Sequence, residues 1–279
     1  MSRPTPKSGG LANALWILAK PTPRVSIEPS ASAVRYSEAK RRGIAPLCDI
    51  YRPQTTGSGL APSVLLLHGG AFVVGKRDMK PIRFVAARLA QAGIGVCSVD
   101  YRLLFRGGGI SQALEDVAHA SAFWRQVAAS YGCGPNISMM GLSAGATLML
   151  LHASATQERY VSLVNAYGAT DFSSVRGRRA EIVMRLLHGT RDRELWKARS
   201  PLYSAPIPSP VLNLHGREDQ MVPVEHSIRF HNDRIERGLV SELELYDDAP
   251  HGWFCDTTRA ESEPSLARSA RFILEHSNR

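Results

Sequence analysis

Residues 141–145 read Gly-Leu-Ser-Ala-Gly, which places a serine between two glycines at the spacing G-x-S-x-G. The apolar run 136–140 before the motif is typical of a buried strand, and the Ala-, Leu- and Met-rich run 144–155 is typical of a helix. A serine on a sharp strand-to-helix turn is held in a strained conformation with its hydroxyl exposed. The glycines remove side chains that would collide there. The pattern therefore predicts Ser143 as a nucleophile.

A serine hydroxyl needs a base to take its proton, and the base needs an acid to orient it. In doubly wound sheets such groups lie in loops beyond the carboxyl ends of strands. Asp219 follows the apolar run 211–214. His251 follows the run 243–246, which gives the chain order serine, acid, histidine. We predict Asp219 as the acid, with Glu218 as its rival, and His251 as the base; a capping acid and a surface histidine are the alternatives.

Two glycines also follow an apolar run near the start of the chain. Attack on an ester carbonyl places negative charge on oxygen, and backbone amides must already point at that position. Gly69 and Gly70 come directly after the run 64–67, and glycine lets the backbone approach a substrate closely. We predict the amides of Gly70 and Ala144 as the oxyanion hole, with Gly69 or Ala71 as a third donor.

Strand-like runs alternate with helical patterns of 10–15 residues along the chain, which predicts parallel βαβ units covered on both faces. The expected fold is α/β, with a doubly wound, mostly parallel eight-stranded sheet. We expect an N-terminal tail or short helix over 1–33 and one domain over 34–279, with a small cap insertion at 170–209. The expected strands are 34–38, 47–51, 64–67, 94–99, 137–140, 161–167, 211–214 and 243–246. The first two should form an antiparallel hairpin at a sheet edge, and Ser111 should cap the helix after the fourth.

The composition excludes several classes of protein. The chain has 279 residues, 44% hydrophobic and 21% charged, which suits a globular protein with a sizeable core. The four cysteines lack metal-ligand spacing, and the formal net charge of +9 is carried by dispersed arginines without a nucleic-acid-binding motif. No run of about 18 apolar residues is present. We expect a cytoplasmic protein; a secretory signal over the apolar run 11–19 with cleavage near 31–33 is the alternative.

Together these motifs resemble the α/β-hydrolase superfamily, in particular the carboxylesterases similar to hormone-sensitive lipase and the related small bacterial esterases. The resemblance covers roughly residues 45–277. It rests on 68–72 (HGGAF), 99–103 (VDYRL), 141–145 (GLSAG), 219–223 (DQMVP) and 249–252 (APHG). It implies a triad of Ser143, Asp219 and His251, with Gly69, Gly70 and Ala144 serving the oxyanion. One departure is that Tyr-Arg-Leu is followed by Leu-Phe-Arg-Gly-Gly-Gly rather than Ala-Pro-Glu, which places the chain off the main branch of that group.

The predicted function is hydrolysis of small or short-acyl carboxylic esters through an acyl-enzyme, without a metal or organic cofactor. The short insertion argues against a deep long-chain pocket, and Phe72, Phe105 and Trp253 are the candidate substrate-binding aromatics. The expected partner is a small-molecule ester, with no nucleic acid and no stable membrane insertion; a homodimer is left open. An arylformamidase-like amidase would use the same groups, and the arginine cluster at 176–193 would then hold a carboxylate or form a solvated face. A non-catalytic binding protein on a hydrolase scaffold is the third hypothesis.

Overall fold

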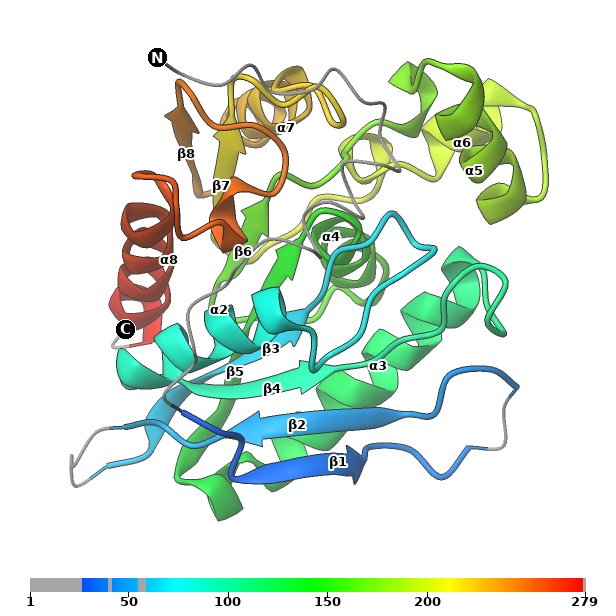
Figure 1. Ribbon diagram of the computed structural model, residues 1–279. Coiled ribbons are helices and arrows are strands. Elements are labelled where there is room, and N and C mark those ends of the chain that lie inside the picture. The colour runs from blue at the N-terminus through cyan, green and yellow to red at the C-terminus, as the bar shows by residue number, and fades with distance from the viewer. Residues whose placement is uncertain (1–26, 40–41, 55–58, 278–279) are drawn as a thin grey trace.

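The computed structural model describes residues 27–39, 42–54 and 59–277. Its strands are β1 (Ala31–Arg35), β2 (Leu47–Tyr51), β3 (Ala61–Leu67), β4 (Gly95–Val99), β5 (Cys133–Leu142), β6 (Leu163–Ala166), β7 (Val211–Gly216) and β8 (Ser241–Tyr246). They form one eight-stranded sheet in the order β1-β2-β4-β3-β5-β6-β7-β8 (Figure 1). β2 runs antiparallel to β1 and β4, and the other neighbours are parallel. The predicted fold class is confirmed.

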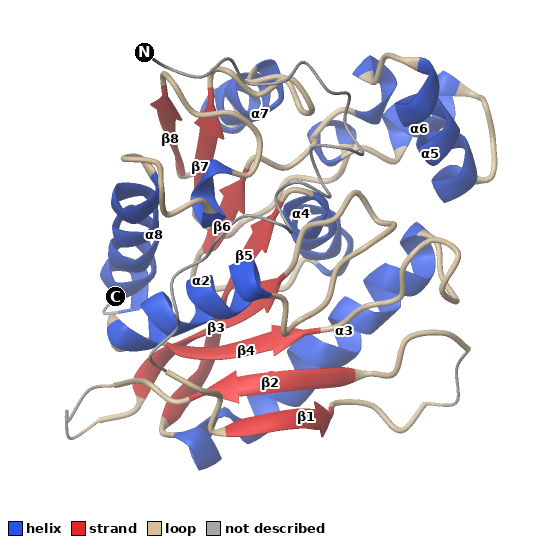
Figure 2. Cartoon of the chain, in the orientation of Figure 1, coloured by secondary structure: helices blue, strands red, loops and turns tan. Residues whose placement is uncertain are grey.

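Helices cover both faces of this sheet (Figure 2). They are α2 (Lys80–Gln91), α3 (Ile110–Val127), α4 (Ala144–Thr156), α5 (Arg178–His188), α6 (Arg193–Ala198), α7 (Glu225–Glu236) and α8 (Ser262–Ser277), with short 3₁₀ turns η1 (Ala128–Tyr131), η2 (Phe172–Ser174), η3 (Pro201–Tyr203) and η4 (Trp253–Cys255). α2 and α8 pack over one face, and α3, α4 and α7 pack over the other.

The central strands are apolar on both sides because each side faces a helical layer. In β3, Val64 and Leu66 belong to the core beneath α2 and α8. Their neighbours Leu65 and Leu67 belong to the core beneath α3 and α4. This alternation explains why residues 64–67 form a continuous apolar run. Polar groups are therefore expected in the loops beyond the carboxyl ends of the parallel strands.

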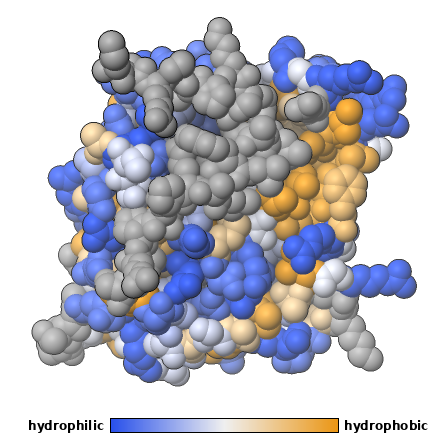
Figure 3. All heavy atoms as spheres, in the orientation of Figure 1, coloured by the Kyte–Doolittle hydropathy of each residue, from blue (hydrophilic) through white to orange (hydrophobic). Residues whose placement is uncertain are grey.

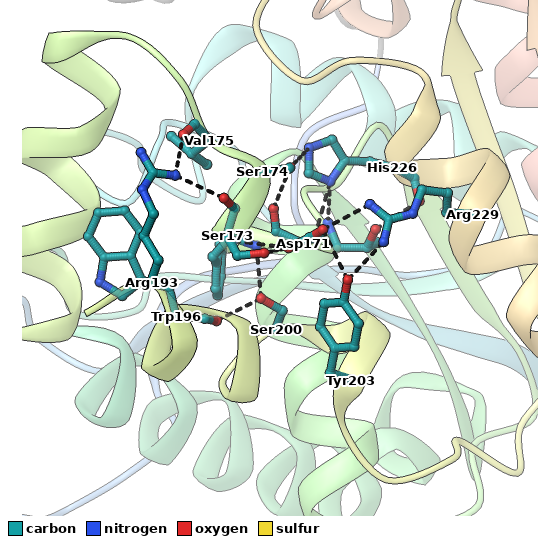
Figure 4. A network of polar contacts seen from close by, with 12 residues as sticks. Asp171, Ser173, Ser174, Val175, Arg193, Trp196, Ser200, Tyr203, His226 and Arg229 are labelled. Carbon is teal, nitrogen blue, oxygen red and sulfur yellow. Dashed lines mark hydrogen bonds and ion pairs between the residues drawn. The ribbon is translucent and has the colours of Figure 1, made fainter. Parts of the chain in front are cut away.

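Residues 170–209 leave the sheet between β6 and β7 and carry α5 and α6 (Figure 1); we call them the β6–β7 insertion. Figure 4 shows the polar network at its base. His226, on α7, accepts hydrogen bonds from the amides of Thr170 and Asp171, each at 3.1 Å. Arg229, one turn further along α7, pairs with the Asp171 carboxylate at 2.9 Å. The insertion is therefore fixed to the first turns of α7.

The β6–β7 insertion presents a mixed basic and apolar surface. Ile182 and Leu186 on α5 are exposed, and so are Arg178 and Arg185 on the same helix. Figure 3 shows an apolar area beside the insertion on this face of the molecule. Two of the arginines expected as a cluster thus lie exposed on this helix.

A buried ion network fixes the segment between β3 and α2. Arg77 donates to the carboxylate of Asp49 through Nε at 2.8 Å and to that of Asp100 through Nη1. The backbone amide of Arg77 also donates to Asp100, at 2.8 Å. All three side chains are almost fully buried. One guanidinium therefore ties this segment to both β2 and the end of β4.

Replacing Arg77 with methionine is expected to lower the free energy of unfolding by about 3–5 kcal/mol, because two carboxylates are left buried without their cation. Urea denaturation followed by circular dichroism measures the loss. The neighbouring Lys76→Met variant is the matched control, since the Lys76–Asp78 ion pair is exposed and such pairs contribute about 0–1 kcal/mol. Equal stabilities for the two variants would show that the Arg77 network does not hold the fold.

Some local expectations need correction. The first strand lies at Ala31–Arg35 rather than 34–38. Ser111 does not cap α3, because the helix already begins at Ile110. The N-cap is Gly109, whose amide donates to the Gln112 side chain. The apolar run 11–19 lies outside the described residues.

Two features are absent from the described part of the chain. In that part we find no helix long and apolar enough to cross a membrane. The same residues contain no group of three or more His, Cys, Asp or Glu side chains placed to hold a metal ion.

Candidate active site

Ser143 lies on the turn between β5 and α4 with φ = 52° and ψ = −117°, a strained conformation for a residue with a side chain. The flanking glycines are required by close contacts. A Cβ at Gly141 would lie 2.4 Å from backbone atoms of Ala146, and one at Gly145 would lie 2.4 Å from the carbonyl oxygen of His68. The strand, turn and helix expected around Ser143 are confirmed.

The structure brings Ser143, His251 and Asp219 together. Ser143 Oγ lies 3.0 Å from His251 Nε2, and His251 Nδ1 lies 2.7 Å from Asp219 Oδ2. Because the carboxylate can only accept, Nδ1 carries a proton and Nε2 is free to accept the serine hydroxyl. Glu218, the rival acid, is exposed to solvent. The arrangement is competent for general-base activation of Ser143.

Asp219 is buried and accepts several hydrogen bonds. Its Oδ1 accepts from the amides of Met221 and Val222 at 2.9 and 2.8 Å. Burial alone would raise the pKa of the carboxyl. The electrostatic attraction and hydrogen bond of His251, together with the nearby ring of His215, outweigh burial and hold the pKa of Asp219 well below its usual range. The acid therefore stays ionised and orients His251.

A glycine lets the loops carrying Asp219 and His251 approach each other. A Cβ at Gly216 would lie 1.9 Å from the carbonyl oxygen of Ala249, so only glycine fits at the end of β7. The same carbonyl accepts from the amide of Glu218 at 3.2 Å. The glycine turn after β7 therefore has a structural role, as its sequence indicates.

The predicted oxyanion residues surround Ser143. Gly69 packs directly against it, since a Cβ there would lie 3.4 Å from Ser143 Cβ. Gly70 and Ala71 both have positive φ, of 131° and 53°, so the backbone turns sharply beside the serine. Ala144 is the first residue of α4. We find no acceptor among the described residues for the amides of Gly70 and Ala144, which leaves both available to a substrate oxygen.

A small apolar cavity of about 70 Å³ opens beside Ser143 and His251. Gly69 and Gly70 line it next to the serine. The rest of its wall is formed by Ala71, Val74, Met79, Pro81, Ile82, Leu142, Tyr167, Met221, Gly252 and Cys255. No lysine, arginine, aspartate or glutamate side chain is among these described residues. The cavity therefore suits an uncharged, apolar group.

The three aromatic residues predicted to bind substrate do not line this cavity. Phe72 is buried and packs edge-on against Phe172, with ring centroids 6.5 Å apart. Trp253 is fully buried between Tyr167 and Tyr246. Phe105 points into solvent with 72% of its surface exposed.

Sequence reasoning missed Tyr167 and the apolar wall at the start of α2. Tyr167 packs edge-on against the His251 ring, with centroids 4.9 Å apart, and it supplies the aromatic surface expected of the other residues. Pro81, the second residue of α2, was the available signal, because it marks where the helix begins. A helix that begins shortly after the two glycines must start close to the serine. Cys255 also lines the cavity, but burial raises the pKa of its thiol to about 12, so it remains uncharged.

The arginine cluster lies apart from the cavity. Arg193 pairs with Glu181 at 2.6 Å. It also donates to the carbonyl oxygens of Ser173 and Val175 (Figure 4). Arg176 donates to the same two carbonyls. None of the arginine side chains that the structure describes in this cluster lines the cavity, which agrees with a solvated face rather than a carboxylate site.

A protein-family model described as BD-FAE matches residues 48–233. The chain is 28% identical to a probable isoprenylcysteine alpha-carbonyl methylesterase of Oryza sativa subsp. japonica, over 78% of this chain and 56% of the relative. It is 30% identical to Esterase LipC of Mycobacterium tuberculosis, over 75% of this chain and 57% of that relative. The chain thus spans about half the length of these curated relatives.

Among solved structures, Esterase B from Lactobacillus rhamnosis superposes with a TM-score of 0.78. The superposition covers 96% of this chain and 91% of that one, at 17% sequence identity. At this identity the similarity shows a shared fold.

Proposed function

Because this chain belongs to the BD-FAE family and has the α/β-hydrolase fold, we propose that it is a serine carboxylesterase for esters with a small or short acyl group. The observation that carries the proposal is the hydrogen-bonded series of Ser143, His251 and Asp219, whose first two members line an apolar cavity. The names of two relatives, a probable methylesterase and an esterase, support ester hydrolysis.

In the proposed reaction, Ser143 Oγ attacks the ester carbonyl carbon while its proton passes to His251 Nε2. The amides of Gly70 and Ala144 donate to the resulting oxyanion. The carbon–oxygen bond to the alcohol then breaks, and His251 returns the proton to the departing oxygen. Water attacks the acyl-enzyme with His251 again as base, which releases the carboxylic acid and restores Ser143. Asp219 stabilises the imidazolium at both steps.

The size of the cavity supports a small acyl group. Its wall beyond the serine is formed by apolar side chains at the start of α2, and its volume is about 70 Å³. The test is hydrolysis of p-nitrophenyl esters from acetate to palmitate, together with labelling of Ser143 by a fluorophosphonate. We expect kcat/KM to peak at short chains and to fall steeply beyond them. A chain that neither hydrolyses any of these esters nor takes the label at Ser143 would not be a serine esterase.

Replacing Met79 with alanine is expected to extend the accepted acyl chain. Met79 lies at the N-cap of α2 and lines the cavity, so its removal opens the end of the wall. Each methylene that fits a pocket contributes roughly 1–3 kcal/mol of discrimination, so the kcat/KM ratio of octanoate to butyrate should rise about 10-fold or more. The two p-nitrophenyl esters measure this ratio directly.

Met184→Ala is the matched control for Met79→Ala. Met184 is buried on α5 in the opposite core and does not line the cavity. Its removal should lower stability and leave the ratio of octanoate to butyrate unchanged. If Met79→Ala also leaves that ratio unchanged, the acyl group does not occupy this cavity.

A further inference from the structure

His215, at the end of β7, lies beside the acid of the proposed triad. Its side chain is fully buried. Nδ1 lies 2.7 Å from Ser227 Oγ, and Nε2 lies 2.8 Å from the carbonyl oxygen of Val222 and 3.3 Å from Asp219 Oδ2. The histidine is thus in contact with the acid, with the turn that follows the acid, and with α7.

The partners determine which nitrogen of His215 carries the proton. A backbone carbonyl oxygen can only accept, so Nε2 is the donor to Val222. Nδ1 is then unprotonated and accepts from the Ser227 hydroxyl. The Nε2–H group points at Val222 O, and Nε2 also lies 3.3 Å from Asp219 Oδ2, the oxygen that His251 binds. Oδ2 therefore lies between two imidazole rings.

His215 also closes the turn that holds the other carboxylate oxygen. The amide of Val222 donates to Asp219 Oδ1 at 2.8 Å, while the carbonyl of the same residue accepts from His215. Rotation about the terminal torsion of an aspartate is only weakly restricted by the side chain itself. The orientation of the carboxylate must come from its partners, and His215 holds both the oxygen that faces His251 and the turn behind it.

We propose that His215 is a positioning residue for catalysis: it holds the Asp219 carboxylate in the orientation that binds His251. This inference rests on the proposed esterase function. His215 touches neither Ser143 nor the cavity wall, so it acts only through Asp219. The titratable groups around it are Asp219, His251 beyond that carboxylate, and His226 on α7.

Two substitutions separate positioning from packing. In His215→Gln the amide nitrogen reaches the place of Nε2 and can donate to Val222 O and Asp219. In His215→Asn the shorter amide reaches only the place of Nδ1, so the contact with Asp219 is lost. His152→Asn is the matched control, because His152 is also buried and bound to a hydroxyl, that of Tyr160 at 2.7 Å, on a part of α4 outside the cavity.

The experiment measures kcat and KM for p-nitrophenyl butyrate, the pH–rate profile, and the rate of Ser143 labelling by a fluorophosphonate, each per folded molecule. We expect His215→Asn to lower kcat and the labelling rate roughly 10- to 100-fold with KM nearly unchanged, as a displaced catalytic group does. His215→Gln should recover most of the loss and keep the wild-type pH profile, and His152→Asn should lose stability only.

Wild-type rates in a folded His215→Asn variant would overturn the positioning role while leaving the esterase intact. Equal losses in the Asn and Gln variants would also overturn it, because packing rather than the Nε2 donor would then matter. A wild-type chain that neither turns over esters nor labels at Ser143 would overturn the proposed function itself, and this inference with it.

Discussion

The Ser143→Ala variant is expected to lose roughly 10⁴- to 10⁶-fold in kcat toward p-nitrophenyl butyrate, because the nucleophile is removed while the cavity remains. Alanine tolerates the positive φ of this position no worse than serine does, so the fold should persist. Initial rates with enzyme at high concentration, after active-site titration of the wild type, measure the difference.

Two further variants sharpen the test. His251→Ala should cost nearly as much as Ser143→Ala, and the double variant little more than either, because groups that act as a unit are strongly non-additive. Ser154→Ala is the matched control: this buried serine of α4 donates to the carbonyl of Ala205 and is not part of the cavity. If Ser143→Ala retains more than about a tenth of the wild-type kcat, another group is the nucleophile.

The second large effect is a loss of stability in mild acid. His152, His188 and His226 are all buried, and burial lowers the pKa of each to about 4. In the unfolded chain their pKa returns to about 6.5. Between these values the unfolded state binds more protons than the folded state, so the free energy of unfolding falls as the pH falls. Each histidine contributes up to about 1.4 kcal/mol per pH unit.

Urea denaturation at a series of pH values between about 7 and 4 measures this slope. His188→Leu isolates one contribution, because neither ring nitrogen of His188 has a hydrogen-bond partner among the described residues and the ring packs between Phe172 and Trp196. The variant should reduce the slope by up to about 1.4 kcal/mol per pH unit within the window. An unfolding free energy that stays constant down to pH 4 would contradict the burial of all three histidines.

The parts of the site set by local sequence were predictable. The turn at Ser143 depends on residues within two positions of the serine. The close contacts at Gly141 and Gly145 exclude any side chain there, which is why the two glycines identify the motif in the sequence. Chain order then points to Asp219 and His251, because both follow strands whose ends share one edge of the sheet. The roles of these residues in catalysis remain predictions.

The cavity wall was not predictable, because it depends on which way a side chain faces. Phe72 and Phe105 are close in sequence to motifs of the site. The side chain of Phe72 nevertheless lies in the core, and that of Phe105 faces solvent. Residues that meet only through strand pairing were missed for a similar reason. Asp49, Arg77 and Asp100 come together through the register of β2 against β4 and the path of the loop before α2, which no local pattern records.

The first turn of α7 couples the β6–β7 insertion to the surroundings of Asp219. His226 holds the base of the β6–β7 insertion, and the next residue, Ser227, holds the histidine that contacts Asp219. A shift of this helical turn, for example on exchange of the insertion, would therefore also move the groups that contact Asp219. A graft of the insertion into another scaffold must carry α7 with it.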